Sequence, residues 1–279
     1  MQEKYTLQCG AYRLERERPL IMAILNITSD SFSGDGLIGR EHELLARAQE
    51  AVLNGADILD IGAESSRPGA PGVSEEEELA RVCGAVSALR DLNVPLSIDT
   101  VRPSVMRAAI EAGASMINDI NAFRSPGAIE VVADASVSLC VMHMQGEPRT
   151  MQQSPYYENV VDEVRAFLSQ RVAALQAAGV QPARIVLDPG FGFGKTPAHN
   201  FSLLKHLAQT TVDGLPILAG LSRKSMLGVV TGQPVQARLA ASLAAAVVAA
   251  EQGAHIVRVH DVAETNDALL VWRAAQSAV

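Results

Sequence analysis

Short apolar segments alternate with longer helical patterns along almost the whole chain. The apolar segments are continuous, which is typical of parallel strands that are buried on both faces. They predict strands at residues 20–25, 57–61, 95–98, 115–118, 137–142, 184–187, 216–219 and 255–259. The remaining pattern predicts helices at residues 41–54, 74–92, 103–113, 126–134, 157–179, 199–209, 234–252 and 262–276. The chain is therefore predicted to repeat a strand–helix unit.

Eight such units predict a closed parallel (β/α)8 barrel, an α/β fold. Gly-Ala pairs in NGAD, EAGAS and EQGAH support this division, because glycine commonly follows the last turn of a helix. An open, doubly wound sheet is the alternative, and the number of units favours the barrel. We expect residues 1–19 to form a hairpin that closes the bottom of the barrel, and residues 1–279 to form a single domain.

The composition of the chain limits its possible partners and its location in the cell. The chain has 23 Lys and Arg residues against 31 Asp and Glu residues, and no basic stripe is visible, so nucleic acid and anionic membranes are not expected partners. The apolar segment 239–250 is shorter than the roughly 20 residues of a membrane span. Cys9, Cys83 and Cys140 are far apart, which favours a reducing, cytoplasmic location over a disulfide framework.

Polar residues follow the predicted strands at their carboxyl ends. In barrels of this kind, the catalytic groups lie on the loops at that end. The set comprises Asn26, Ser66, Arg67, Asp99, Asn118, His143, Asp188, Ser222 to Lys224, and Arg258 to His260. Their convergence on one mouth predicts an enzyme.

Residues 188–195, DPGFGFGK, place glycines before a lysine, as phosphate-binding loops do. The spacing excludes both common kinds, because Pro189 and Lys195 stand where a Walker loop and a dinucleotide loop need glycine. We expect the glycines to allow a sharp turn beneath a ligand. Phe191 and Phe193 then offer a flat apolar face, with burial of either ring in the core as the alternative. Lys195 is expected at the surface.

Asp99 and Asp188 are expected to point into the same mouth. Two carboxylates can perform acid–base chemistry, hydrolyse glycosides, or hold a flat heterocycle through paired hydrogen bonds. A helix cap is the alternative for Asp99. Arg258 and His260 follow the eighth strand, where barrels often bind phosphate. A surface position at a helix start is the alternative for His260.

Two further segments adjoin these polar residues. Residues 26–36 and 62–72 are rich in Ser, Gly, Asp and Pro, and we expect them to close over a reactive intermediate. The run from Glu75 to Glu78 is interpreted as structural, because acidic residues stabilise a helix start.

Eight motifs in this order resemble the dihydropteroate synthase family. They are NITSDSFS, ESSRPGA, SIDT, INDI, MHMQGEPRTMQ, DPGFGFGK, GLSRKS and RVHDV, one for each predicted strand, and the resemblance covers the chain from about residue 19 to 262. The resemblance implies a homodimeric transferase of folate biosynthesis that uses Mg²⁺. Such an enzyme joins 6-hydroxymethyl-7,8-dihydropterin diphosphate to para-aminobenzoate, forming 7,8-dihydropteroate and pyrophosphate.

The resemblance also implies roles for individual residues. The pterin site would comprise Asp99, Asn118, Ile120, Met142, Asp188, Phe193, Gly220 and Lys224. The diphosphate site would comprise Asn26, Ser66, Arg258 and His260, with Asn26 and Asp35 as ligands of Mg²⁺. The para-aminobenzoate site, where sulfonamides compete, would comprise Phe32, Ser66, Arg67, Pro68, Phe193, Lys224 and Ser225. Asp99, Lys224 and Arg258 are the expected catalytic residues.

Two other interpretations remain. A pterin-binding barrel of the methyltransferase kind would keep the pterin residues but would not need Arg258, His260 or the SRPG sequence. A catalytically inactive pterin-binding protein would have lost members of the polar set, and none is missing.

Overall fold

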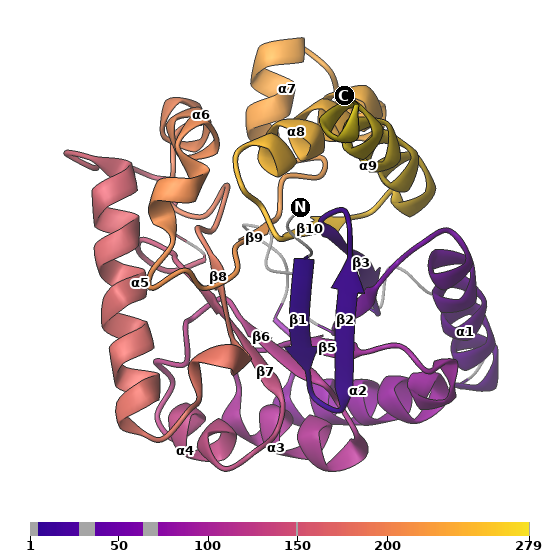
Figure 1. The fold of residues 1–279 in the computed structure, drawn as a ribbon. Helices are drawn as coiled ribbons and strands as arrows, with labels where there is room; N and C mark the ends of the chain where they lie inside the picture. The colour runs from indigo at the N-terminus through magenta and orange to yellow at the C-terminus, as the bar shows by residue number, and fades with distance from the viewer. Residues whose placement is uncertain (1–4, 28–36, 64–71, 149, 279) are drawn as a thin grey trace.

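The chain forms a barrel of eight parallel strands surrounded by helices (Figure 1). The structure, a computed structural model, describes residues 5–27, 37–63, 72–148 and 150–278. The barrel strands are β3 (Leu20–Asn26), β4 (Ile58–Gly62), β5 (Leu96–Asp99), β6 (Met116–Asp119), β7 (Ser138–Met142), β8 (Ile185–Asp188), β9 (Leu218–Ala219) and β10 (Ile256–Val259). They lie side by side in the order β8-β7-β6-β5-β4-β3-β10-β9.

The two ends of this order meet, so the barrel closes. Leu187 of β8 forms a parallel bridge with Ile217, which directly precedes β9. The backbone N–H of Leu187 also donates to the carbonyl of Pro216 at 2.9 Å. Closure confirms the predicted (β/α)8 barrel and excludes the open sheet.

The helices are α1 (Leu37–Leu53), α2 (Glu75–Leu89), α3 (Pro103–Ala112), α4 (Ala128–Ala133), α5 (Val160–Ala177), α6 (Pro197–Lys205), α7 (Ser225–Thr231), α8 (Leu239–Glu251) and α9 (Val262–Ser277). All except α7 correspond to predicted helices. Helix α7 was not predicted, because this helix is short and contains Gly228 and three β-branched residues, which disfavour helix. Among the described residues, no helix is both long and apolar enough for a membrane span.

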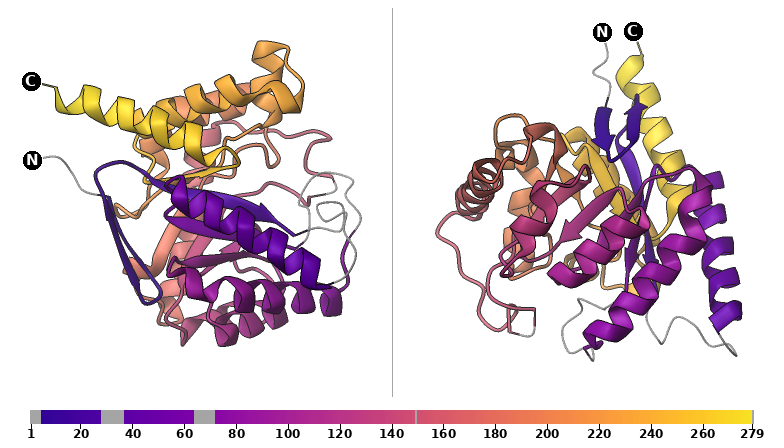
Figure 2. Two further views of the ribbon diagram at one scale, coloured as in Figure 1. Left: turned by 90° about the vertical axis from the view of Figure 1, so that its right-hand side faces the viewer. Right: turned by 90° about the horizontal axis from the view of Figure 1, so that it is seen from below.

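A hairpin covers the end of the barrel at which the strands begin (Figure 2). It consists of β1 (Tyr5–Cys9) and β2 (Tyr12–Arg16), paired antiparallel. Leu7 and Leu14 are buried against side chains from the strand starts, among them Leu20 and Met116. The predicted hairpin is confirmed, and it leaves the opposite end of the barrel for a site.

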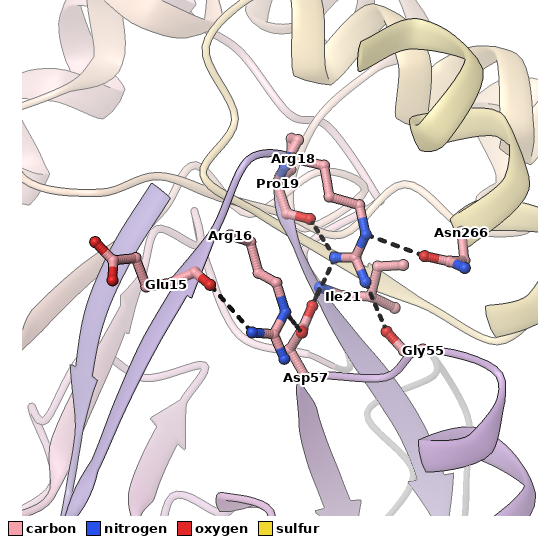
Figure 3. A network of polar contacts seen from close by, with 8 residues as sticks. All are labelled: Glu15, Arg16, Arg18, Pro19, Ile21, Gly55, Asp57 and Asn266. Atoms are coloured by element: carbon pink, nitrogen blue, oxygen red, sulfur yellow. Dashed lines mark hydrogen bonds and ion pairs between the residues drawn. The ribbon is translucent and has the colours of Figure 1, made fainter. Parts of the chain in front are cut away.

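One buried carboxylate ties the hairpin to the barrel (Figure 3). Asp57 accepts hydrogen bonds from Arg16 Nε at 2.6 Å and Arg18 Nη1 at 2.7 Å. It also accepts from the backbone N–H of Ile21 at 2.8 Å. Arg18 donates in turn to Asn266 Oδ1 of α9 at 3.0 Å. This network joins the hairpin, β3 and the last helix.

Candidate active site

A cavity of about 560 Å³ opens at the carboxyl ends of the strands. The residues predicted to bind pterin, diphosphate or para-aminobenzoate that lie within the described part of the chain all line it: Asn26, Asp99, Asn118, Ile120, Met142, Asp188, Phe193, Gly220, Lys224, Ser225, Arg258 and His260. The predicted residues Phe32, Asp35, Ser66, Arg67 and Pro68 lie outside the described residues. Residues as far apart in sequence as Asn26 and His260 thus share one cavity.

Strand geometry explains why the polar groups meet. Asn26, Asp99 and Asp188 are the last residues of β3, β5 and β8. Asp99 is also the pairing partner of Asn118 in the parallel ladder of β5 and β6. Side chains on one level of a parallel barrel are directed to the same mouth, so closure of the barrel brings these groups together.

Asp60, which the sequence analysis does not single out, lies beneath the cavity. It is a fully buried residue of β4 and accepts a hydrogen bond from Ser97 Oγ at 2.6 Å. Arg258 Nε donates to the same carboxylate at 2.7 Å, and Arg258 Nη2 lies 3.0 Å from Asp99 Oδ2. Asn118 Nδ2 approaches Asp60 Oδ2 to 3.4 Å. Asp60 therefore orients both a cation and an amide of the cavity.

The amide of Asn118 has one oxygen that is ready for a ligand. Its Nδ2 group faces Asp60, whereas Oδ1 is buried and accepts no hydrogen bond from the described residues. An unsatisfied buried acceptor costs about 1–3 kcal/mol. A ligand that donates an N–H group in the cavity would remove this cost.

Both cavity carboxylates are destabilised as anions. Burial raises the pKa of Asp99 to about 7, although the charge of Arg258 opposes the shift. Burial also raises the pKa of Asp188, although its hydrogen bond from the N–H of Gly190, at 2.7 Å, opposes the shift. Desolvated carboxylates favour ligands that donate hydrogen bonds or carry positive charge.

The alternatives for two residues are wrong. Asp99 does not cap a helix, because α3 begins after Arg102. His260 is half-buried and lines the cavity, with Nδ1 3.0 Å from Ser222 Oγ. Arg223, in the same strand-end loop as Ser222, forms an ion pair with Asp261. His260 is thus held by a neighbouring loop and does not extend into solvent.

The cavity also has an apolar wall. Phe193 packs in a cluster with Met142, Met144 and Met151, and Ile120 packs against this cluster. A flat apolar ring system could stack here, which agrees with the predicted apolar face.

Lys224 extends this wall with a charge. Its Nζ lies 4.3 Å from the centre of the Phe193 ring, within the range of a cation–π contact. Phe191 is almost fully buried, as the alternative of a ring buried in the core predicted, but it also lines the cavity.

The glycines of DPGFGFGK are required by close packing. Gly190 and Gly194 have positive φ angles of 69° and 61°. A Cβ atom at Gly190 would overlap the carbonyl oxygen of His143, and one at Gly194 would overlap that of Gln145. The predicted sharp turn is confirmed, and the loop lies directly on the backbone that follows β7.

The prediction of a surface position for Lys195 is wrong. Lys195 is only 3% exposed, because the loop turns its carbonyl groups inward around the ammonium group. Nζ lies 2.9 Å from the carbonyl oxygen of Gly190 and 3.0 Å from that of Phe193. It also lies 2.9 Å from His143 Nδ1. His143, which was expected at the mouth, therefore faces this buried lysine and not the cavity.

Several cavity residues were not predicted as site residues. They are Ile24, Met151, Gln152, Gly192 and Val235, whereas Phe191, Ser222 and Arg223, which also line the cavity, were expected at the mouth. Met151 and Gln152 come from the segment between β7 and α5, and both end the motif MHMQGEPRTMQ. Because neither Met151 nor Gln152 is charged, the sequence did not indicate that these two residues line the cavity.

The fold and the cavity define a (β/α)8-barrel enzyme whose mouth combines buried carboxylates with an Arg–His pair. The pterin binding enzyme family matches residues 22–260 of this chain. The dihydropteroate synthase of Haemophilus influenzae is 47% identical over 266 residues, which cover 95% of this chain and 97% of the relative.

Solved structures agree with this match. The Burkholderia cenocepacia dihydropteroate synthase complexed with 7,8-dihydropteroate is 55% identical, with a TM-score of 0.89, over 98% of this chain and 96% of that one. The Xanthomonas albilineans dihydropteroate synthase with 4-aminobenzoic acid is 46% identical, with a TM-score of 0.92, over 99% and 100%. The chain belongs to the dihydropteroate synthase family, and it is a transferase.

Proposed function

We propose that this chain joins 6-hydroxymethyl-7,8-dihydropterin diphosphate to para-aminobenzoate, forming 7,8-dihydropteroate and pyrophosphate. The observation that carries the proposal is that Asp99, Asn118, Asp188 and Arg258 line one cavity. The ligands of the two solved relatives support the choice of substrates. The methyltransferase alternative has no observation in its favour.

The pterin ring would bind at the floor of the cavity. Asp188 would accept the 2-amino group and N3–H in two parallel hydrogen bonds, since a carboxylate has about four acceptor sites and Gly190 occupies one. Asn118 Oδ1, which is buried and unsatisfied, would accept a further N–H group. Ile120, Met142 and Gly220 would line the ring, with Phe193 beside it.

The diphosphate would bind to Arg258 and His260. Among the described residues, Asp60 and Asp99 accept hydrogen bonds from Nε and Nη2 of Arg258, and its Nη1 donors would contact phosphate oxygens. Ser66 and Asn26 would add polar contacts.

The residues fit Mg²⁺ only if the ion arrives with the diphosphate. Among the residues that the structure describes, no group of three or more His, Cys, Asp or Glu could hold a metal. Mg²⁺ commonly takes one or two protein ligands together with substrate phosphates and water. Asn26 offers a hard amide oxygen beside the diphosphate site, and Asp35 is the further candidate. The bound ion would neutralise charge on the departing pyrophosphate.

The reaction would begin with cleavage of the bond between the methylene carbon and the diphosphate oxygen. The electron pair leaves with pyrophosphate, and the electron-rich dihydropterin ring shares the positive charge. Asp99 stabilises this cation, and Arg258 stabilises the leaving group. The amine nitrogen of para-aminobenzoate then bonds to the methylene carbon and releases a proton.

Para-aminobenzoate would approach between Phe193, Lys224 and Ser225, with Phe32, Ser66, Arg67 and Pro68 completing its site. Sulfonamides would compete there, because they present the same aniline ring. Closure of residues 26–36 and 62–72 would keep water from the cation.

We also propose a homodimer that forms through the last helices. Exposed apolar side chains occur on all three of α7, α8 and α9: Val229 and Val230 are each 67% exposed, Val248 is 44% exposed and Val271 is 71% exposed. These helices pack against one another, as Figure 1 shows. Large apolar side chains left exposed on neighbouring helices are candidates for a protein interface.

A cytoplasmic location stays a prediction from the unpaired cysteines.

The test is a turnover assay with the pterin diphosphate, para-aminobenzoate and Mg²⁺. We expect release of pyrophosphate that depends on para-aminobenzoate, with one 7,8-dihydropteroate formed for each pyrophosphate. Pterin binding without turnover would contradict the proposal.

A further inference from the structure

We propose that Lys195 is a positioning residue, whose buried ammonium group holds the loop between β8 and α6 so that Asp188 and Phe193 face the pterin. The inference rests on the proposed function, because it concerns the same cavity. Lys195 does not line the cavity itself, and the mechanism above assigns it no role.

Burial lowers the pKa of Lys195 to about 7, although the charge of Asp188 opposes the shift, so below pH 7 the side chain carries an ammonium group and its surroundings match one. An ammonium group has three N–H donors, and three acceptors lie within 3.0 Å of Nζ: the carbonyl oxygens of Gly190 and Phe193 and Nδ1 of His143. Burial lowers the pKa of His143 to about 2, so its ring is neutral and can accept through Nδ1. Every donor of the ammonium group therefore has a partner.

The loop acceptors connect Lys195 to the two residues that face the ligand. Gly190, whose carbonyl accepts from Lys195, donates its N–H to Asp188 Oδ1 at 2.7 Å. Phe193, whose carbonyl also accepts from Lys195, donates its N–H to the carbonyl of Gly190 at 3.1 Å. One ammonium group thus holds two residues of the loop: Gly190, whose N–H orients the Asp188 carboxylate, and Phe193, which carries the stacking ring.

The contact with His143 fixes the loop relative to the barrel. His143 directly follows β7, and its backbone N–H donates to the carbonyl of Asp188 at 2.9 Å. Its ring packs edge-on against Phe167 of α5, with 4.9 Å between ring centres. Lys195 therefore holds the loop against a rigid strand end.

A lysine that merely filled space could be replaced by a neutral, unbranched side chain of similar size. Lys195→Met keeps an unbranched side chain that is one atom shorter, but it leaves three buried acceptors without their donors, which favours rotation of the loop peptides. The two explanations therefore differ in what this substitution does to ligand affinity.

The first experiment compares Lys195→Met with Lys205→Met, which removes the same charge from an exposed site on α6. The probe is 6-hydroxymethylpterin, titrated by calorimetry, together with hydrogen exchange of peptides covering residues 188–196. We expect at least about a tenfold weaker affinity and faster exchange for Lys195→Met, the loss of one charge-assisted hydrogen bond, and no change for Lys205→Met. Unchanged affinity and exchange would overturn the inference.

A second pair perturbs the site less and decides the question if Lys195→Met fails to fold. His143→Asn keeps an acceptor, because its Oδ1 can take the place of Nδ1, whereas His143→Leu has similar size and no acceptor. Both lose the ring contacts equally. We expect His143→Asn to bind the pterin at least several-fold more tightly than His143→Leu, and equal affinities would contradict the inference.

The outcomes of these measurements distinguish a failure of this inference from a failure of the proposed function. If the unaltered protein fails to bind 6-hydroxymethylpterin, the proposed function fails, while the exchange data still report on the loop. If it binds and turns over but the variants behave like it, only the role of Lys195 fails.

Discussion

The guanidinium group of Arg258 lies 3.0 Å from the carboxylate of Asp99, and this contact joins β10 to β5 across the mouth of the barrel. In the proposed mechanism, Arg258 stabilises the negative charge of the leaving diphosphate, and Asp99 stabilises the positive charge of the pterin cation. Asp60, below them, contacts the same guanidinium group. A change at any of the three residues should therefore affect both halves of the reaction.

Asp60→Asn tests this coupling. The substitution keeps an acceptor for Ser97 but removes the negative charge that holds Arg258. We expect kcat/KM for the pterin diphosphate to fall at least about tenfold, as for loss of a hydrogen bond between charged groups. The matched control is Asp91→Asn, whose side chain is 94% exposed. Equal kcat/KM values for the two variants would count against a role for Asp60.

Asp99 should make the stability of the ligand-free protein depend on pH. Burial raises its pKa from 3.8 to about 7, so between these values the folded state holds a proton that the unfolded state has lost. Its contribution to stability therefore falls as pH rises from about 4 to 7, by at most about 1.4 kcal/mol per pH unit.

Urea unfolding of the wild type and Asp99→Asn at several pH values measures this contribution. We expect the free energy of unfolding of the wild type, relative to the variant, to decrease between pH 5 and pH 7. A difference that stays constant or rises would mean that Asp99 is already ionised at pH 5.

Asp188→Asn should weaken pterin binding. The variant retains one carbonyl oxygen but presents an N–H₂ group to the donor edge of the pterin, and the charge is lost. We expect a loss of about 1.5–3 kcal/mol in the binding free energy of 6-hydroxymethylpterin, measured by calorimetry. Unchanged affinity would refute the assigned contact.

Gly190→Ala and Gly214→Ala form a matched pair that separates backbone strain from close packing. Both glycines have φ near +70°, which costs about 1–2 kcal/mol for alanine. A Cβ atom meets nothing within 4 Å at Gly214 but overlaps the backbone of His143 at Gly190. We expect Gly190→Ala to lower the free energy of unfolding by at least about 1–3 kcal/mol more than Gly214→Ala. Equal losses would mean that the loop can move away from β7.

Local patterns in the sequence predict the barrel well. Four of the strands, β3, β5, β6 and β8, are apolar runs that end at Asn26, Asp99, Asp119 and Asp188, so the pattern locates both the strand and the polar side chains at its end. This is why Asp99, Asn118 and Asp188 could be placed at one mouth before their contacts were known. The resemblance to the family then assigned chemical roles that spacing alone left open.

The residues that sequence reasoning misses depend on contacts between distant segments. Asp60 lies inside a strand, where only its charge within the apolar run ILDIG is unusual, and its partners come from β5, β6 and β10. Lys195 follows a glycine-rich loop that looks exposed, and it is buried because the loop folds onto His143. The residues next to Asp60 and Lys195 in the sequence do not indicate that these two side chains are buried.

The most direct test of the site is a crystal structure of this chain with bound 6-hydroxymethylpterin. We expect the ring in the cavity, with its 2-amino and N3–H groups within about 3 Å of the Asp188 carboxylate. An N–H group should point at Asn118 Oδ1, and the hydroxymethyl group should point toward Arg258 and His260. A pterin bound outside this cavity, or bound with its hydroxymethyl group against Asp188, would contradict the proposed site.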